Sequence, residues 1–92
     1  MSVRRRISGL SLYFFEGCPW CTRVRSALDR LGLEIELRDI QADRARRAEL
    51  LAATGRATVP CLRIEEGASA RWMHESADII RWLEKTYAES DR

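Results

Sequence analysis

The chain has 92 residues, of which 46% are hydrophobic and 33% charged, and its formal net charge is +2. A chain of this size forms one small domain and buries about two-thirds of the surface that its unfolded form exposes. The small net charge does not favour a nucleic-acid partner, and the absence of an apolar run of roughly 20 residues excludes a membrane span, so we expect neither nucleic acid nor membrane as a partner.

Apolar periodicity, capping residues and turn residues divide the chain into an N-terminal arm and one domain. Residues 1–8 are expected to be a flexible arm, and residues 9–88 the domain. The predicted elements are a strand at Leu10–Phe15, a helix at Pro19–Leu31 stopped by Gly32, a strand at Glu34–Arg38, a helix capped by Asp43 and ended by Thr54-Gly55, strands at Pro60–Glu65 and Arg71–Met73, and a helix capped by Ser76 that runs to Tyr87. The first β-α-β unit predicts parallel strands and the later hairpin predicts antiparallel ones.

Two cysteines stand at the junction of the first predicted strand and the first predicted helix, in the sequence Gly17-Cys18-Pro19-Trp20-Cys21. Two thiols one helical turn apart share a face and lie within reach of a disulfide bond. Cys18 also stands at the helix start, where unpaired N–H groups and the helix dipole stabilise a thiolate, the nucleophile of disulfide exchange. The pair therefore predicts a reversible dithiol switch.

Three separate segments carry a resemblance to a known family. Cys18–Cys21 is similar to Cys-Pro-Tyr-Cys, residues 54–60 resemble Thr-Gly-x-x-Thr-Val-Pro, and residues 75–80 resemble a Glu-Ser-x-x-Ile signature. The chain thus resembles a glutaredoxin, of the branch with a glutathione-transferase-like N-terminal domain. The resemblance implies an α/β fold of the thioredoxin type, β-α-β-α-β-β-α, with a mixed four-stranded sheet flanked by helices.

The activity implied by the resemblance is glutathione-dependent thiol–disulfide oxidoreduction, with protein–glutathione mixed disulfides and protein disulfides as substrates. Cys18 would be the nucleophile and Cys21 the more buried resolving thiol. Glutathione would be a co-substrate, with no tightly bound cofactor and no metal, and oxidised or glutathionylated client proteins would be the partners of a monomer. The three cysteines are too few for a secreted disulfide framework, and the stretch after Arg4-Arg5-Arg6 lacks a cleavage pattern, so we expect a cytoplasmic protein.

The resemblance also implies a glutathione-binding set. Its members are Trp20, Arg56, Thr58, Val59, Pro60, Glu75 and Ser76. A cis-proline at Pro60 would leave the N–H and C=O of Val59 free to pair with the extended tripeptide. Ser76 and the helix N-terminus would hold the γ-glutamyl carboxylate. Arg56 would contact the glycine carboxylate, and Glu75 would orient the loop or meet the γ-glutamyl amine. The alternatives are a helix cap for Ser76, a strand-start proline for Pro60 and a solvated Arg56.

Departures from the family pattern concern residues beside the motif. Trp20 replaces the usual Tyr, and Glu16 stands where glutaredoxins often have a basic residue, which disfavours an anionic ligand unless Arg23 and Arg25 offset it. Cys61 is expected to be a small buried residue, and His74, the only histidine, an ordinary polar one.

Other functions remain as alternatives. Cys18 and Cys21 could form half of a zinc site, completed only by Cys61 and His74. An iron–sulfur or metal carrier is disfavoured because cluster-binding glutaredoxins tend to lack the proline found at position 19. A thioredoxin-like protein reduced by a flavoenzyme would have no use for Glu75-Ser76, and a non-catalytic transferase-like module would not need both cysteines.

Overall fold

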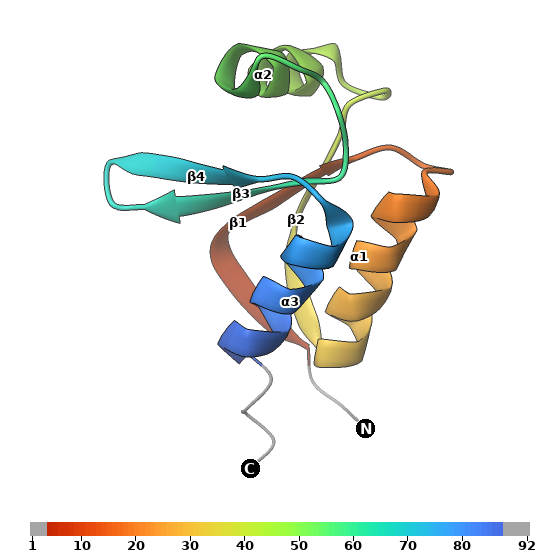
Figure 1. Ribbon diagram of the computed structural model, residues 1–92, viewed down its shortest axis with the longest axis vertical. Helices are drawn as coiled ribbons and strands as arrows, with labels where there is room; N and C mark the ends of the chain where they lie inside the picture. The colour runs from red at the N-terminus through yellow and green to blue at the C-terminus, as the bar shows by residue number, and fades with distance from the viewer. Residues whose placement is uncertain (1–3, 88–92) are drawn as a thin grey trace.

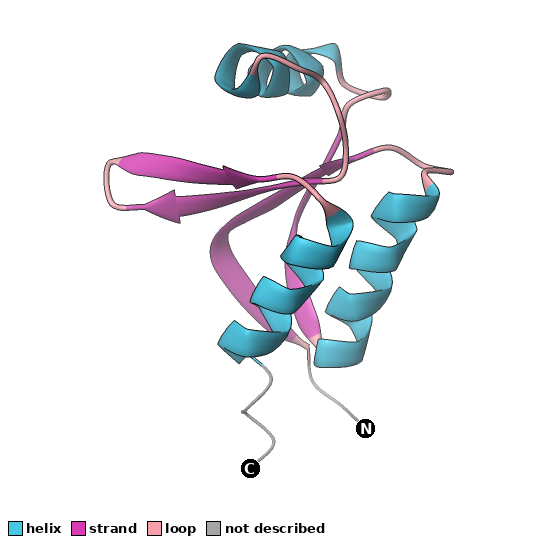
Figure 2. Cartoon of the chain, viewed as in Figure 1, coloured by secondary structure: helices cyan, strands magenta, loops and turns pink. Residues whose placement is uncertain are grey.

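The computed structural model of the protein describes residues 4–87. Its elements are β1 (Arg5–Phe14), α1 (Pro19–Leu31), β2 (Leu33–Asp39), α2 (Arg44–Thr54), β3 (Cys61–Glu66), β4 (Ser69–Met73) and α3 (Ser76–Tyr87), as Figures 1 and 2 show. This is the predicted β-α-β-α-β-β-α order. Several boundaries differ from the prediction by one or two residues; for example, β3 begins at Cys61 and β4 at Ser69.

The four strands form one sheet in the order β2-β1-β3-β4. β1 is parallel to β2 and antiparallel to β3, and β3 is antiparallel to β4. The predicted mixed sheet flanked by helices is therefore confirmed.

Side chains of β1 alternate between the two faces of the sheet, which separates two apolar clusters. Leu12 and Phe14 pack in the larger cluster with Val24 of α1 and Leu83 of α3. Tyr13 packs on the other face, in a smaller cluster completed by Ile40, Leu50 and Cys61. α1 and α3 thus lie side by side against one face, and α2 lies on the other (Figure 1).

The expected flexible arm is wrong for residues 5–8, which belong to β1. The Arg5 N–H donates to the Gly32 carbonyl over 2.7 Å, and Arg5 and Arg6 pair with Leu33 and Glu34 of β2. The pairing register shifts between Arg6 and Ser11. Gly9 lies within this shift and adopts a φ of +87°, a conformation that favours glycine. The residues before it still belong to the strand because they pair with the edge of β2. Arg4, just before the strand, forms an ion pair with Asp29 over 2.7 Å, and residues 1–3 of the expected arm lie outside the described residues.

The predicted helix signals are confirmed for α1 and α2. Asp43 caps α2 by accepting a hydrogen bond from the Ala45 N–H over 3.0 Å. Gly32 and Gly55 end α1 and α2 in the left-handed conformation, with φ of +71° and +82°.

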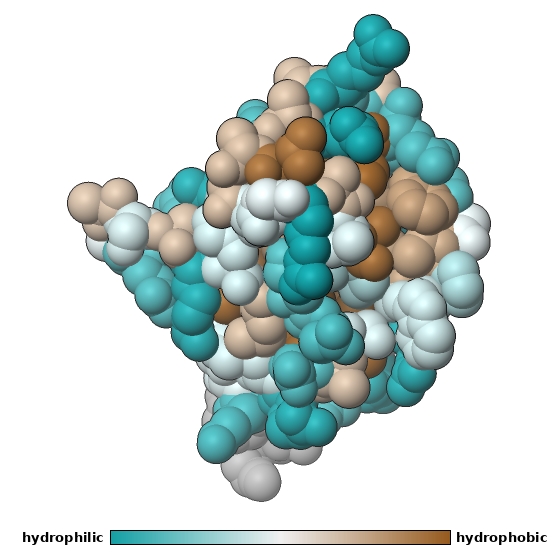
Figure 3. Space-filling view, turned by 45° about the horizontal axis from the view of Figure 1, so that its top comes forward, coloured by the Kyte–Doolittle hydropathy of each residue, from teal (hydrophilic) through white to brown (hydrophobic). Residues whose placement is uncertain are grey.

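On the face shown in Figure 3, brown hydrophobic areas are interrupted by teal hydrophilic side chains. Within residues 4–87, no helix has the length and apolar character that crossing a membrane requires.

Candidate active site

Cys18 lies where the chain leaves β1 and enters α1. Gly17, with a φ of +89°, makes the turn, and Pro19 occupies the first helical turn, where no N–H partner is lost. The Cys18 sulfur accepts a hydrogen bond from the Cys21 N–H over 3.3 Å, so this thiol is itself the cap of α1. It is held next to the unpaired N–H groups of the first turn, a position that suits an anion.

Both thiols of the motif are free and buried. The exposed fraction is 4% for Cys18 and 1% for Cys21, so Cys18 is the more exposed, as expected, but by a small margin. Burial raises the pKa of the Cys21 thiol, and the neighbouring Cys18 thiol raises it further. Cys21 therefore stays protonated at neutral pH until a reaction at Cys18 changes its surroundings.

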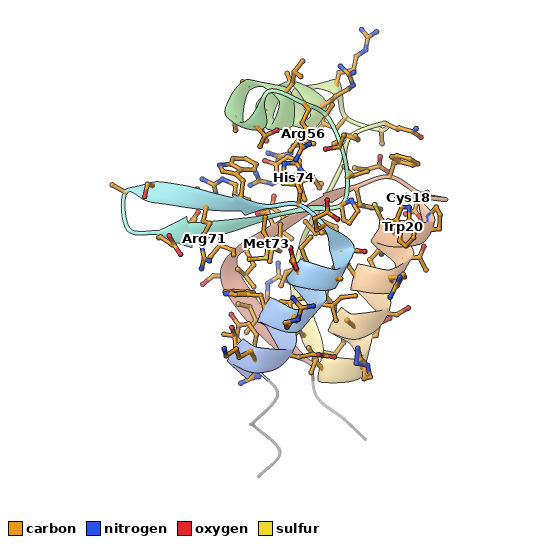
Figure 4. The ribbon with its side chains drawn as sticks, viewed as in Figure 1. Cys18, Trp20, Arg56, Arg71, Met73 and His74 are labelled. Atoms are coloured by element: carbon orange, nitrogen blue, oxygen red, sulfur yellow. The ribbon has the colours of Figure 1, made fainter. Side chains whose placement is uncertain are left out.

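An open pocket of about 430 Å³ adjoins this end of α1. Its walls contain all seven residues of the predicted glutathione-binding set, namely Trp20, Arg56, Thr58, Val59, Pro60, Glu75 and Ser76. Figure 4 shows Cys18 and Trp20 at the start of α1, with Arg56 and His74 between α2 and the sheet. Segments separated by more than 50 residues of sequence thus meet at one pocket.

Three further residues line the pocket, Arg23, His74 and Ala77, which were not predicted to do so. Arg23 follows Trp20 by three positions on α1, a spacing that puts both on one helix face, and its guanidinium carbon lies 5.6 Å from the Trp20 ring centroid. This helical spacing was the signal that could have identified Arg23. Trp20 is 55% exposed, so it presents a flat apolar surface beside Cys18.

The segment between α2 and β3 forms one wall of the pocket. The Val59–Pro60 peptide bond is cis, as the resemblance implied, and Pro60 is buried. Within residues 4–87, neither the N–H nor the C=O of Val59 has a hydrogen-bond partner. The segment is held at its start by Thr54, whose hydroxyl lies 2.7 Å from the Arg56 carbonyl oxygen. An extended peptide could therefore pair with Val59 along this wall.

The start of α3 forms the opposite wall and differs from the prediction. Ser76 is the first residue of the helix rather than its cap. The Ile79 N–H donates to the Glu75 carbonyl over 3.0 Å, and Glu75 adopts a φ of +61°. Because the backbone of Glu75 satisfies this N–H, the Ser76 hydroxyl is not used for it. The N–H groups of the first turn of α3 lie at a pocket wall where a carboxylate would be favoured.

The charge of Glu16 is offset by one of the two expected arginines. Arg25 forms an ion pair with Glu16 over 3.2 Å, whereas Arg23 lies over Trp20. Both members of this pair are partly exposed, so the pair adjusts local charge more than it stabilises the fold.

Cys61 is completely buried in the smaller apolar cluster, which confirms the expectation of a small buried residue. His74 lies at the pocket wall, 3.8 Å from the Cys61 sulfur through Nε2. The zinc alternative requires these two residues to join Cys18 and Cys21. Among residues 4–87, no group of three or more cysteine, histidine or acidic side chains is arranged to hold a metal ion.

A family model described as the glutathione S-transferase N-terminal domain matches residues 12–91. The chain belongs to this family of thioredoxin-fold proteins. Glutaredoxin 3 of Escherichia coli strain K12 is 30% identical over 59 residues, which are 64% of this chain and 71% of that protein. The predicted relationship to glutaredoxins and to glutathione-transferase N-terminal domains is thus confirmed.

Two other relatives are longer than the chain. Mouse prostaglandin E synthase 2 is 36% identical over 81 residues, which are 88% of this chain but 20% of that protein. The crystal structure of maleylacetoacetate isomerase from Anaeromyxobacter dehalogenans, with GSH bound in its active site, superposes with a TM-score of 0.67 at 30% identity. That match covers 87% of this chain and 38% of the isomerase. The chain thus spans about a fifth to two-fifths of these two relatives, over the thioredoxin-like domain.

Proposed function

We propose that the protein is a glutathione-dependent thiol–disulfide oxidoreductase that acts on protein–glutathione mixed disulfides and protein disulfides. The observation that carries the proposal is the position of Cys18. Its thiol caps α1 beside a pocket whose walls offer a free peptide edge at Val59 and a helix N-terminus at Ser76. A site of this kind suits a short peptide with carboxylates at both ends, and glutathione is such a peptide.

The pocket residues match the charges of glutathione. Arg56 is placed to pair with the glycine carboxylate, and Ser76 with the first N–H groups of α3 to bind the γ-glutamyl carboxylate. Glu75 supplies the negative charge for the γ-glutamyl ammonium group. The structure of the related isomerase with bound GSH supports glutathione as the ligand.

In the first step, the Cys18 thiolate attacks the glutathione sulfur of a mixed disulfide. The Cys18–glutathione disulfide forms, and the client cysteine leaves as a thiolate that takes up a proton. A second glutathione, as its thiolate, attacks the glutathione sulfur bound to Cys18. This releases oxidised glutathione and restores the Cys18 thiolate, so the cycle needs no Cys21.

Cys21 is needed when the substrate is a protein disulfide. After Cys18 forms a mixed disulfide with the client, Cys21 loses its proton and attacks the Cys18 sulfur, which releases the reduced client and leaves a Cys18–Cys21 disulfide. Two glutathione molecules then reduce that disulfide. Such exchange is reversible at glutaredoxin potentials of about −200 to −230 mV, which fits a protein acting in the reducing cytoplasm.

A glutathione transferase or isomerase activity is the second candidate, because the related isomerase has GSH bound in its active site. In that case Cys18 would hold or activate glutathione without a disulfide step, and Cys21 would have no role with any substrate.

The test is glutathione-coupled reduction of a glutathionylated peptide and of a protein disulfide, measured with the parent protein, Cys18→Ser and Cys21→Ser. We expect Cys18→Ser to lose both activities and Cys21→Ser to lose only the second. Activity that survives Cys18→Ser, or a parent without either activity, would contradict the proposal. The visible absorbance of freshly purified protein tests the iron–sulfur alternative. Replacing glutathione by a thioredoxin reductase in the same assay tests the thioredoxin-like alternative.

A further inference from the structure

A buried thiol behind the pocket wall is linked by contacts to an imidazole and a hydroxyl that line the pocket. The Cys61 sulfur lies 3.8 Å from His74 Nε2, and His74 Nδ1 lies 3.3 Å from Thr58 Oγ1. The three residues come from the start of β3, the residue after β4 and the segment before Pro60. Nothing in the proposed reaction uses Cys61 or His74.

Cys61 is unsuited to act as a nucleophile. It is completely buried, and burial raises the pKa of its thiol to about 11, against a smaller opposite effect of Arg56. At neutral pH the thiol therefore keeps its hydrogen. Burial and the nearby Arg56 also lower the pKa of His74, although Glu75 opposes them, so the imidazole is neutral and has one N–H and one acceptor nitrogen.

The arrangement of partners selects one imidazole tautomer. A thiol is both a weak donor and a weak acceptor, but the Met73 backbone already hydrogen-bonds to the Cys61 sulfur, which leaves the S–H hydrogen to be donated to a bare ring nitrogen. Cys61 thus favours the form in which Nε2 carries no hydrogen. The hydrogen is then on Nδ1, which donates to Thr58 Oγ1. Since this oxygen is an acceptor for His74, its own hydrogen must be directed elsewhere.

We propose that Cys61 and His74 are positioning residues that orient the Thr58 hydroxyl as a hydrogen-bond donor to a carboxylate in the pocket. Thr58 is exposed at the pocket wall, where Arg56 supplies a positive charge for the same group. The opposite tautomer would take up the Thr58 hydrogen and present an oxygen lone pair, which repels a carboxylate. The carboxylate is that of the glycine of glutathione, and this assignment rests on the function proposed above. The hydrogen bonds among Cys61, His74 and Thr58 do not depend on that function.

The hydrogen-bond chain of Cys61, His74 and Thr58 is tested first in the protein without any ligand. His74 is the only histidine, so a long-range ¹H–¹⁵N spectrum of the untagged ¹⁵N-labelled protein reports its tautomer without further assignment. At neutral pH we expect the Nδ1–H form in the parent and in Cys61→Ser, and a shift towards the Nε2–H form in Cys61→Ala. An Nε2–H tautomer in the parent overturns the proposal, whether or not the protein turns over glutathione.

The effect on the ligand is tested by the KM for glutathione in the disulfide assay. Loss of one hydrogen bond to a charged group predicts that Thr58→Val raises this KM at least about tenfold, with a smaller effect on kcat. His74→Gln should raise it about threefold, because its amide reaches towards Cys61 but not Thr58. His74→Asn places an amide nitrogen near the position of Nδ1 and should restore most of the loss.

A double variant distinguishes positioning from general damage. If His74 acts through the Thr58 hydroxyl, Thr58→Val with His74→Gln should raise the KM no more than Thr58→Val alone. Additive effects, or equal losses in His74→Asn and His74→Gln, overturn the proposal. A parent that shows the Nδ1–H tautomer but no glutathione turnover would instead contradict the proposed function and leave the hydrogen-bond chain supported.

Discussion

The backbone N–H of Cys21 donates a hydrogen bond to the Cys18 sulfur over 3.3 Å, so the two cysteines are joined in the free-thiol state. This contact makes Cys18 the cap of α1 and places Cys21 one turn inside the helix. Both cysteines belong to the larger apolar cluster, but only Cys18 stands at the helix end that adjoins the pocket, whereas Cys21 is inside the first turn.

Alkylation of the native protein should distinguish the three thiols. Iodoacetamide is expected to modify Cys18 first, with Cys21 and Cys61 reacting at least about tenfold more slowly at neutral pH, since each unit of raised pKa removes about nine-tenths of the thiolate. Peptide mass spectrometry over time measures the three rates. In concentrated urea the rates should converge. A Cys61 rate similar to that of Cys18 in the native protein would show that the structure overstates its burial.

Glu16→Gln should favour the reaction of Cys18 with anionic reagents. The substitution removes the carboxylate that is paired with Arg25 and leaves that arginine unpaired near the motif. We expect the ratio of the iodoacetate rate to the iodoacetamide rate to rise about two- to threefold at low ionic strength and to fall back in high salt. The neutral reagent is the internal control. A ratio unchanged at low salt would mean that Glu16 does not influence the site.

Ser76→Ala should weaken glutathione binding without lowering the stability of α3. The hydroxyl lies at the pocket wall and does not cap the helix. We expect the KM for glutathione to rise about fivefold, the value of one hydrogen bond, with a thermal midpoint near that of the parent. Ser26→Ala, on the exposed surface of α1, is the matched control. A large loss of stability with unchanged KM would restore the capping role that the sequence predicted.

Tyr13→Phe should destabilise the contact between α2 and the sheet. The buried Tyr13 hydroxyl accepts from Arg38 over 2.6 Å and donates to Glu49 of α2 over 2.9 Å. Removing it leaves both partners less satisfied, at an expected cost of about 1–2 kcal/mol in the free energy of unfolding. Urea unfolding measures this cost. Tyr87→Phe is the control, because within residues 4–87 no partner for the Tyr87 hydroxyl is found; an equal loss there would argue against the network.

The same network predicts how stability depends on acid. Burial acts to raise the pKa of Glu49, but hydrogen bonds from Tyr13 and Arg46 outweigh it and lower the pKa below its ordinary 4.5. Its contribution to stability is thus present above that value and lost as the pH falls below it. Urea unfolding from pH 6 to pH 3 should show a steeper loss in the parent than in Glu49→Gln. Parallel curves would contradict this.

Much of the fold could be predicted from local patterns. Apolar spacing identified α1 and α3, whereas α2, whose buried residue is Leu50, was identified by its cap Asp43 and its stop Gly55; Gly32 ended α1 as expected. The first part of β1 was missed because Arg5 and Arg6 have no apolar alternation and pair with β2, a segment more than 25 residues away. Likewise, Ser76 matched a capping pattern, but the left-handed Glu75 before it changed which residue begins α3.

The three motifs and the family resemblance they carry were sufficient to name the thiol pair and seven of the ten residues that line the pocket, because each motif depends on adjacent residues. The tertiary structure alone decided which groups face one another across those segments. Arg25 rather than Arg23 pairs with Glu16, and His74 lies between Cys61 and Thr58. Such contacts join residues on different elements, and their geometry depends on how α1, β3 and β4 pack, which no local spacing specifies.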